Sequence, residues 1–273
     1  MLKNRIFNKY ALLGLTLGLL PVTADAVVDS QKPLIVIGAS YASAKTPYTG
    51  ASAPLGGTAV NGSAYLSLGD ALVREKSLPG FVVNEGQAGA TSFARQDCNA
   101  TTCQSPGWDS YLTMFNKALP RVLAPPTFSS FGAKYVVITI PNDCLHAGAF
   151  DQPQSLTTPC TLQQIDESID RMIAVGQSVI SMGLTPVFDN YPKYNDLDLN
   201  HFKNTFGLPW VIDQTSYNKL RNRYKNRIQS ELPNAIQVDV WKNFTHIGDG
   251  IHPNVETAKK AAKLLANALI ARD

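Results

Sequence analysis

The chain has 273 residues, of which 44% are hydrophobic and 16% are charged. This balance excludes a disordered or fibrous protein, and the length suffices for one large α/β domain with a substantial core. The formal charge of +3 gives no sign of a surface that attracts nucleic acid or anionic membranes.

The N-terminal residues 1–26 predict a secretory signal peptide. A basic head and the apolar run 11–20 precede Ala24-Asp25-Ala26, which is a small-x-small cleavage site. The apolar run is short for a membrane span, although an uncleaved anchor is the alternative. We therefore expect a nearly neutral mature chain that starts near Val27 and is secreted or periplasmic.

Four cysteines suit an exported chain. Their even number predicts two disulfides, most simply Cys98–Cys103 and Cys144–Cys160, although three connectivities are possible. A zinc site is the alternative, but the spacings lack the paired C-x2-C pattern of such sites.

Strands and helices alternate along the chain from residue 34 onward. Apolar, β-branched runs predict buried strands at 34–37, 81–84, 134–140, 185–190 and 235–240. Apolar periodicity predicts helices at 64–76, 107–123, 161–183 and 213–232, and a last helix after Asn254. This alternation predicts a three-layer α/β/α sandwich, flavodoxin-like, with a five-stranded parallel central sheet. We see no second domain, so residues 27–273 form the expected domain.

Local signals refine these helices. Pro120 is expected to end or kink the second helix early. Thr161 and Gln164 form a capping box for the third, which Gly183 stops. The helix 213–232 is basic, and a solvated face explains its charges better than nucleic-acid binding does.

Three segments are expected to shape a substrate pocket. They are the Gly- and Ser-rich loop 45–63, the segment around Cys98 and Cys103, and the aromatic-rich connection 191–212. Ordinary loop packing is the alternative for each. None carries a pattern that identifies an acyl chain length or a sugar.

Polar residues follow the strands at the edge where open α/β sheets bind ligands. Ser40 comes just after the turn at Gly38, and it is either a nucleophile or a helix N-cap. Gly86 and Gly89 follow the second strand and predict a tight turn whose N–H groups can bind an oxyanion. Asn142 follows the third strand, so its amide can point into the same crevice.

A loop between the last strand and the last helix carries Asp249 and His252. Pro253 keeps His252 out of helical geometry, and Asp249 is near enough in sequence to reach one imidazole nitrogen. The other nitrogen can face Ser40. This is the arrangement of nucleophile, base and orienting carboxylate.

The sequence contains three histidines besides His252. His246 is a rival base, because it lies three residues before Asp249. His146 follows the Asn142 loop and His201 lies in the aromatic connection, and both are expected to be structural or peripheral.

Four blocks in chain order resemble those of the SGNH (GDSL-type) hydrolases. They are Gly38-Ala39-Ser40, Asn84 to Thr91 with Gly89, Pro141-Asn142-Asp143, and Asp249-Gly250-Ile251-His252-Pro253. The resemblance covers nearly all of the expected mature chain, and the Asp-x-x-His block is the most specific. Two departures stand out: Ala39 replaces an Asp, and Ile140-Pro141 replaces Gly-x. We expect the third block to take a different path, held by a Cys144–Cys160 disulfide.

The resemblance implies a carboxylic ester hydrolase with a serine nucleophile. His252, oriented by Asp249, would deprotonate Ser40, which would form an acyl-enzyme. The backbone N–H groups of Ser40 and Gly89 and the side chain of Asn142 would form the oxyanion hole. The resemblance implies no metal and no cofactor.

The substrate class stays open at this point. Lipid esters, lysophospholipids and short acyl esters suit the mechanism. Alternatives are removal of O-acetyl groups from a polysaccharide or cell wall, acyl transfer to an acceptor other than water, and a binding protein on a degenerate SGNH fold. We expect a monomer that binds a small-molecule, lipid or glycan ester, with no nucleic acid and no stable membrane insertion.

Overall fold

A computed structural model describes residues 33–43, 65–78, 81–96, 107–122, 133–145, 159–206 and 213–272. Four expectations fall outside this part of the chain: the signal peptide, the loop 45–63, the Cys98–Cys103 disulfide and the role of His146. The stretch 207–212 of the aromatic-rich connection is also outside it. The described residues form one sheet with helices on both of its faces.

The strands are β1 (Leu34–Ile37), β2 (Val82–Asn84), β3 (Tyr135–Ile138), β4 (Thr185–Asp189) and β5 (Ile236–Val238). They pair in the order β2-β1-β3-β4-β5, and every pair is parallel. This order is the flavodoxin-like one, so the predicted fold is confirmed. All four residues of β1 and of β3 are buried, which explains their continuous apolar sequences.

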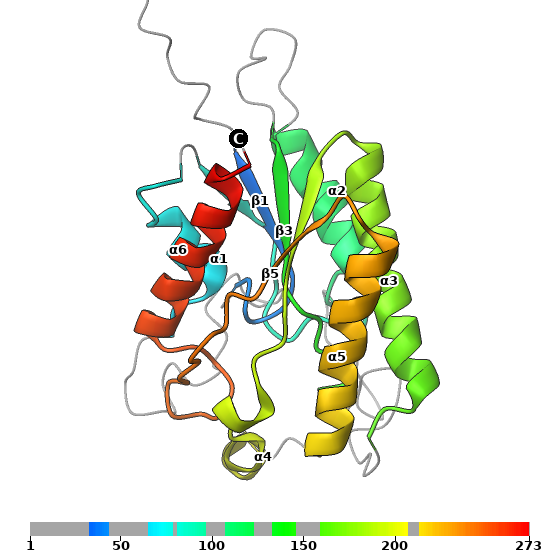
Figure 1. The fold of residues 1–273 in the computed structure, drawn as a ribbon, viewed down its shortest axis with the longest axis vertical. Helices are drawn as coiled ribbons and strands as arrows, with labels where there is room; N and C mark the ends of the chain where they lie inside the picture. The colour runs from blue at the N-terminus through cyan, green and yellow to red at the C-terminus, as the bar shows by residue number, and fades with distance from the viewer. Residues whose placement is uncertain are drawn as a thin grey trace, which may run out of the picture.

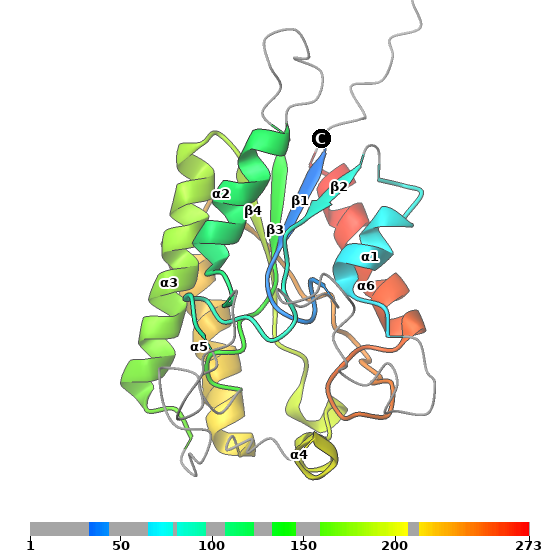
Figure 2. The same cartoon turned by 180° about the vertical axis from the view of Figure 1, so that it is seen from behind.

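The helices are α1 (Leu68–Val73), α2 (Tyr111–Val122), α3 (Leu162–Ser181), α4 (Leu199–Phe206), α5 (Gln214–Glu231) and α6 (Val255–Ile270), and Tyr194–Asp196 forms the 3₁₀ turn η3. Helices α1 and α6 cover one face of the sheet, whereas α2, α3 and α5 cover the other (Figures 1 and 2). Helix α4 lies beyond the carboxyl ends of the strands, at the bottom of Figure 1.

Side-chain caps fix several helix starts. The capping box of Thr161 and Gln164 is present at α3, and Asp213 and Asn254 accept N–H groups at the starts of α5 and α6. Helix α1 is shorter than the predicted 64–76, because Ser67 caps it and sets its start at the next residue.

One expectation about helices was wrong in part, and one helix was not predicted. Pro120 does not end α2, which continues to Val122. A proline in the last turn removes a single intrahelical hydrogen bond, and its fixed φ suits a helix. The connection 191–212 contains helix α4 and the turn η3, which the sequence pattern did not indicate.

Three arginines of the basic helix α5 contact neighbouring segments, while Lys219 and Lys225 are exposed. Arg223 pairs with Asp166, and Arg227 lies 2.7 Å from a carboxylate oxygen of Asp170, both on α3. Arg221 donates to the backbone carbonyl of Tyr191 at 2.8 Å. These three arginines therefore serve internal contacts.

We expect Gly38→Ala to lower the free energy of unfolding more than Gly183→Ala does. Both glycines have positive φ, of 140° and 73°, which costs a side chain about 1–2 kcal/mol. A Cβ at position 38 would also lie 2.0 Å from Oγ1 of Thr139, whereas position 183 has no atom within 4 Å. Urea unfolding should show a loss above about 3 kcal/mol for Gly38→Ala and about 1 kcal/mol for the matched control. Equal losses would contradict the steric explanation.

Candidate active site

The turn that carries Ser40 begins where β1 ends. The Gly38 carbonyl accepts the Gln87 N–H at 2.9 Å, and the Ala39 carbonyl accepts the N–H groups of Ala42 and Ser43. Ser40 therefore sits in a tight helical turn, and only 5% of its surface is exposed. The turn lies between the carboxyl ends of β2 and β3, because Gly38 contacts segments that follow both strands.

Asp249 and His252 form a buried hydrogen-bonded pair. Oδ2 of Asp249 lies 2.5 Å from Nδ1 of His252, while Oδ1 accepts the N–H groups of Ile251 and His252 at 3.0 and 2.9 Å. Burial raises the pKa of the Asp249 carboxyl, but the hydrogen bond and charge of His252 outweigh it and hold that pKa below its ordinary value. The carboxylate is therefore ionised at neutral pH and selects the tautomer with a proton on Nδ1.

Two aromatic rings enclose the His252 imidazole. The Tyr65 and Phe202 rings meet it edge-on, with centroids 4.9 and 6.1 Å away. Nε2 of His252 is buried and makes no hydrogen bond, so the structure does not contain a Ser40–His252 hydrogen bond. Catalytic hydrogen bonds of free enzymes are often long and tighten only when substrate binds.

Tyr41 connects the serine turn to the histidine loop. Its hydroxyl donates to the Ile251 carbonyl at 2.8 Å, and this buried bond spans 210 positions of the chain. The Tyr41 ring packs on Trp241, with centroids 4.8 Å apart. Ser40 and His252 are thus each adjacent in sequence to one end of this bond.

A small pocket brings Ser40 and Asn142 together. Both residues line it, as does Ile251 beside His252. Gly89 is not among the lining residues, although it lies in a turn with φ of 85°. The sequence prediction that Ser40 and Asn142 share a crevice agrees with this geometry.

The third block is anchored through its backbone. The Ile140 N–H donates to Oδ1 of Asp189 at 2.7 Å, and the Ile140 carbonyl accepts the Tyr111 hydroxyl at 3.1 Å. The Pro141 carbonyl accepts the Tyr191 hydroxyl at 2.9 Å. Buried side chains thus hold Ile140 and Pro141, where the resembling family has Gly-x.

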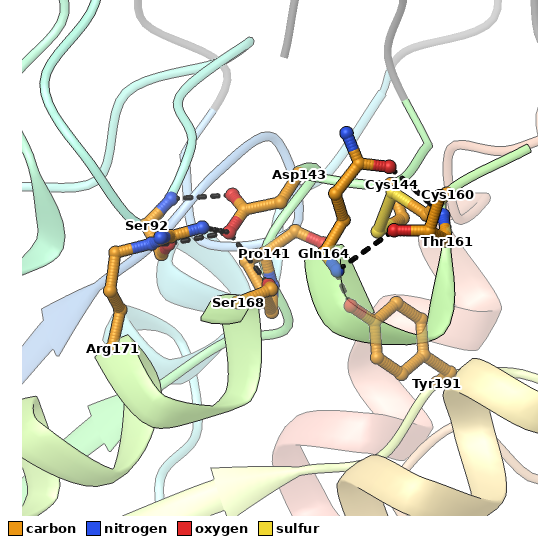
Figure 3. The surroundings of a disulfide bond; sticks show 10 residues. All are labelled: Ser92, Pro141, Asp143, Cys144, Cys160, Thr161, Gln164, Ser168, Arg171 and Tyr191. Atoms are coloured by element: carbon orange, nitrogen blue, oxygen red, sulfur yellow. Dashed lines mark hydrogen bonds and ion pairs between the residues drawn. A yellow bond between two sulfur atoms is a disulfide. The ribbon is translucent and has the colours of Figure 1, made fainter. Parts of the chain in front are cut away.

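A buried polar cluster holds the residue after Asn142. Asp143 accepts the N–H of Ser92 at 2.7 Å and the Ser168 hydroxyl at 2.6 Å, and Arg171 lies 3.3 Å from the same carboxylate (Figure 3). Arg171 also donates to the Ser92 hydroxyl at 2.7 Å. The cluster ties the Asn142 loop to Ser92, which directly follows the second block, and to helix α3.

The Cys144–Cys160 disulfide adjoins this cluster (Figure 3). It joins the end of the Asn142 loop to the residue before the Thr161 cap of α3. This predicted disulfide is confirmed.

The second block is held by side chains from neighbouring segments. Trp108 Nε1 donates to the Ala88 carbonyl at 2.8 Å, and Arg95 donates to the Gly89 carbonyl at 2.7 Å. The Asn84 amide donates to the Ala42 carbonyl at 2.8 Å, which fastens this block to the serine turn.

His246 has a different environment from His252. Its Nδ1 accepts the N–H groups of Gly248 and Gly250 at 3.0 and 3.1 Å, so it shapes the loop that carries Asp249. His201 is exposed at the start of α4, where its N–H donates to Asp198.

Sequence reasoning missed several residues that position the site. One is Tyr41, which directly follows Ser40. Another is Asp189, which ends strand β4, and a polar residue at the carboxyl end of a strand was the signal that could have identified it. Tyr65 and Phe202 carried no signal, because their contact with His252 depends on tertiary packing.

Among the described residues, no group of three or more His, Cys, Asp or Glu side chains could hold a metal ion. No helix in this part of the chain is long and apolar enough to cross a membrane.

Comparison with solved structures shows which proteins share this fold. No protein-family model and no curated protein matches the chain. Est24, a carbohydrate acetylesterase from Sinorhizobium meliloti, is similar with a TM-score of 0.56 at 14% identity, over 89% of this chain and 100% of that one. The inhibitor-bound aryl esterase of M. smegmatis gives a TM-score of 0.55 at 14% identity, over 88% and 99%. At this identity the likeness shows a shared fold, which is the fold that the SGNH resemblance implies.

Asp189 should make stability depend on pH. Its side chain is fully buried, and burial raises the pKa of its carboxyl to about 7, although the N–H groups of Trp241 and Ile140 lower it. An unfolded aspartate titrates near pH 4, so between about pH 4 and 7 only the folded state keeps the proton. The contribution of Asp189 to stability therefore decreases as pH rises through this window.

When pH falls from 7.5 to 5.5, we expect the free energy of unfolding of the wild type to rise by about 2 kcal/mol relative to that of Asp189→Asn. Urea unfolding of both proteins at the two pH values measures this difference. Asp213→Asn is the control, because the pKa of Asp213 is lowered and that group does not titrate in this window. A difference that is independent of pH would show that Asp189 is ionised throughout.

Proposed function

We propose that this chain, which has the fold of SGNH hydrolases, is a serine esterase that hydrolyses carboxylic esters. One observation carries the proposal: the Tyr41–Ile251 hydrogen bond brings the buried Asp249–His252 pair to the turn of Ser40. Asn142 lines the same pocket as Ser40. The residues that we propose as nucleophile, base, orienting carboxylate and amide donor all lie in segments that follow strands at the carboxyl edge of the sheet.

The proposed reaction starts at the Ser40 hydroxyl. Nε2 of His252 accepts the hydroxyl proton while the oxygen attacks the ester carbonyl carbon. The imidazolium that forms is stabilised by Asp249, and it then donates the proton to the leaving alcohol. Water attacks the resulting acyl-enzyme in the same way, which releases the acid and restores Ser40.

Three donors would stabilise the oxyanion of each tetrahedral intermediate. These are the backbone N–H groups of Ser40 and Gly89 and the side-chain amide of Asn142. The Arg95 and Trp108 contacts to the second block would fix the Gly89 donor, and the Asp143 cluster would fix Asn142.

Burial supports the assignment of His252 as the base. Asp249 is fully buried and His252 is 1% exposed, so water does not screen their interaction. The ionised Asp249 keeps the proton on Nδ1, which leaves the lone pair on Nε2. That atom makes no hydrogen bond that would compete for it.

Further support comes from the comparisons and the disulfide. Est24 is described as a carbohydrate acetylesterase and the M. smegmatis protein as an aryl esterase. The Cys144–Cys160 disulfide suits the oxidising compartment to which the predicted signal peptide would direct the chain. We propose an exported monomer that acts on small-molecule, lipid or glycan esters.

Substitution of Ser40 and Asn142 tests the reaction. We expect Ser40→Ala to abolish hydrolysis of p-nitrophenyl acetate, because it removes the nucleophile. Asn142→Ala should lower kcat by about a hundred- to a thousand-fold, the usual effect of losing one oxyanion donor. Both values follow from initial rates measured on the purified protein.

Asn142→Asp serves as a size-matched companion variant, because it keeps the shape but loses the N–H donor. Circular dichroism and melting temperature verify that each variant is folded. Near-wild-type turnover in Asn142→Ala would refute the oxyanion role, and activity in Ser40→Ala would refute the nucleophile.

The two histidines of the loop should behave differently. We expect His252→Ala to abolish activity and His246→Ala to keep the pH profile of kcat/KM while losing about 1–3 kcal/mol of stability, because two backbone N–H groups lose their acceptor. His246→Asn, which restores an acceptor, should recover part of that stability. Unfolding curves and pH profiles of the three variants measure both effects. The reverse pattern, with His246 essential and His252 dispensable, would make His246 the base.

A further inference from the structure

Asp189 is a buried carboxylate that takes no part in the proposed reaction steps. It ends strand β4, and none of its surface is exposed. Its Oδ1 accepts the Ile140 N–H at 2.7 Å, and its Oδ2 accepts the Trp241 indole N–H at 2.9 Å. Both donors are neutral, so no cation among the described residues balances the charge of this carboxylate. Because burying such a group is costly, its presence points to a role for both acceptor oxygens.

The first oxygen anchors the loop of the proposed oxyanion donor Asn142. Strand β3 ends at Ile138, so the sheet does not hold Ile140, which lies two residues before Asn142. The Ile140 N–H donates to Asp189 instead, and Ile140 lines the same pocket as Ser40 and Asn142. Loss of the Asp189–Ile140 bond would therefore shift the backbone that carries this donor.

The second oxygen supports the connection between the serine turn and the histidine loop. The Trp241 ring, which Asp189 orients through the indole N–H, packs on the Tyr41 ring with centroids 4.8 Å apart. Tyr41 in turn donates to the carbonyl of Ile251, which directly precedes His252. A single side chain is thus linked to both halves of the proposed site.

From these contacts we propose that Asp189 is a positioning residue, which holds the Asn142 loop and the Tyr41–Ile251 connection in register. This inference rests on the proposed function. An ionised carboxylate offers full acceptors on both oxygens, whereas a neutral carboxyl or an amide keeps one full acceptor and carries hydrogen on the other atom. The role therefore needs the ionised side chain, because one of the two N–H groups would otherwise face a second donor.

Asp189→Asn tests this role, because it keeps the shape and removes one acceptor. We expect kcat for p-nitrophenyl acetate to fall about tenfold or more, with KM changed less than about threefold, since a displaced oxyanion donor weakens binding of the transition state rather than of the substrate. Near-wild-type kcat in the folded variant would overturn the inference and leave the esterase standing. If folded wild type hydrolyses no ester in a Ser40-dependent way, the proposed function fails, and the inference with it.

Trp241→Phe provides a rescue experiment. It removes the indole N–H and keeps a ring against Tyr41, so an Asn at position 189 no longer faces a second donor while its oxygen still accepts the Ile140 N–H. We expect the double variant Asp189→Asn/Trp241→Phe to have a kcat about threefold or more above that of Asp189→Asn. A double variant slower than Asp189→Asn would overturn the requirement for two acceptors.

The same background keeps the test decisive if Asp189→Asn alone does not fold. In Trp241→Phe, Asp189→Asn retains an acceptor for Ile140, whereas Asp189→Leu has a similar size and no acceptor. We expect kcat of the Leu variant to be about tenfold or more below that of the Asn variant. Equal kcat in the two folded double variants would overturn the inference.

The pH dependence of kcat gives a further readout. Burial raises the pKa of the Asp189 carboxyl to about 7, so protonation below this pH removes the second acceptor of wild type as the Asn substitution does. The ratio of wild-type to Asp189→Asn kcat should therefore decrease about threefold or more from pH 8 to pH 6, and protonation of His252 cancels because both proteins contain it. A constant ratio would overturn the requirement for the ionised form.

Other titratable groups do not produce this change in the ratio. Among the described residues, Asp239 contributes to the raised pKa of Asp189 and is present in both proteins. Burial also raises the pKa of the tyrosines that interact with Asp189, so they stay protonated between pH 6 and pH 8; these are Tyr41, Tyr111, Tyr217 and Tyr224.

Ile228→Ala is the control for a general loss of stability. Ile228 is fully buried near the end of α5, at the opposite edge of the sheet from the carboxyl ends of the strands (Figure 1). The variant opens a cavity in the core but changes no hydrogen bond of Asp189, so we expect kcat within about twofold of wild type. A tenfold loss in this control would attribute the effect of Asp189→Asn to destabilisation and overturn the inference.

Discussion

A buried hydrogen bond between the Tyr41 hydroxyl and the Ile251 carbonyl holds the candidate site together. Ser40 and His252 come from opposite ends of the chain, on loops that follow the first and the last strand. The sheet brings these loops to one edge, but it does not fix the distance between them. Tyr41 does so, because its ring packs on Trp241 while its hydroxyl reaches the histidine loop.

Trp241 extends the same constraint to the third block. Its indole N–H donates to Oδ2 of Asp189, whose Oδ1 accepts the Ile140 N–H. One buried carboxylate thus connects the aromatic support of Tyr41 to the residue two positions before Asn142. The replacement of Gly-x by Ile140-Pro141 is compatible with an ordered Asn142 because this network holds the backbone. The Ile140 side chain lines the same pocket as Ser40 and Asn142.

The sequence was enough to predict the five-stranded parallel sheet and the segments that follow its strands at the carboxyl edge, because periodicity and strand-end polar residues are local signals. Helix α4 was missed because it has only eight residues and lies within a long aromatic-rich connection, although Asp198 accepts the His201 N–H as an N-cap would. The partners of Ile140 and His252 were missed for another reason. Tyr111 and Phe202 contact them only after the chain has folded, so no short-range pattern contains that information, whereas Asp189 at least carried the signal of a polar residue at the end of a strand.

Two buried aspartates, Asp249 and Asp189, have pKa values shifted in opposite directions by their surroundings. Asp249 faces an imidazole that can carry positive charge, so its pKa lies below the ordinary value despite burial. Asp189 faces only neutral N–H donors, so burial dominates and its pKa rises to about 7. Negative charge at neutral pH is therefore concentrated on the carboxylate that would stabilise the His252 imidazolium.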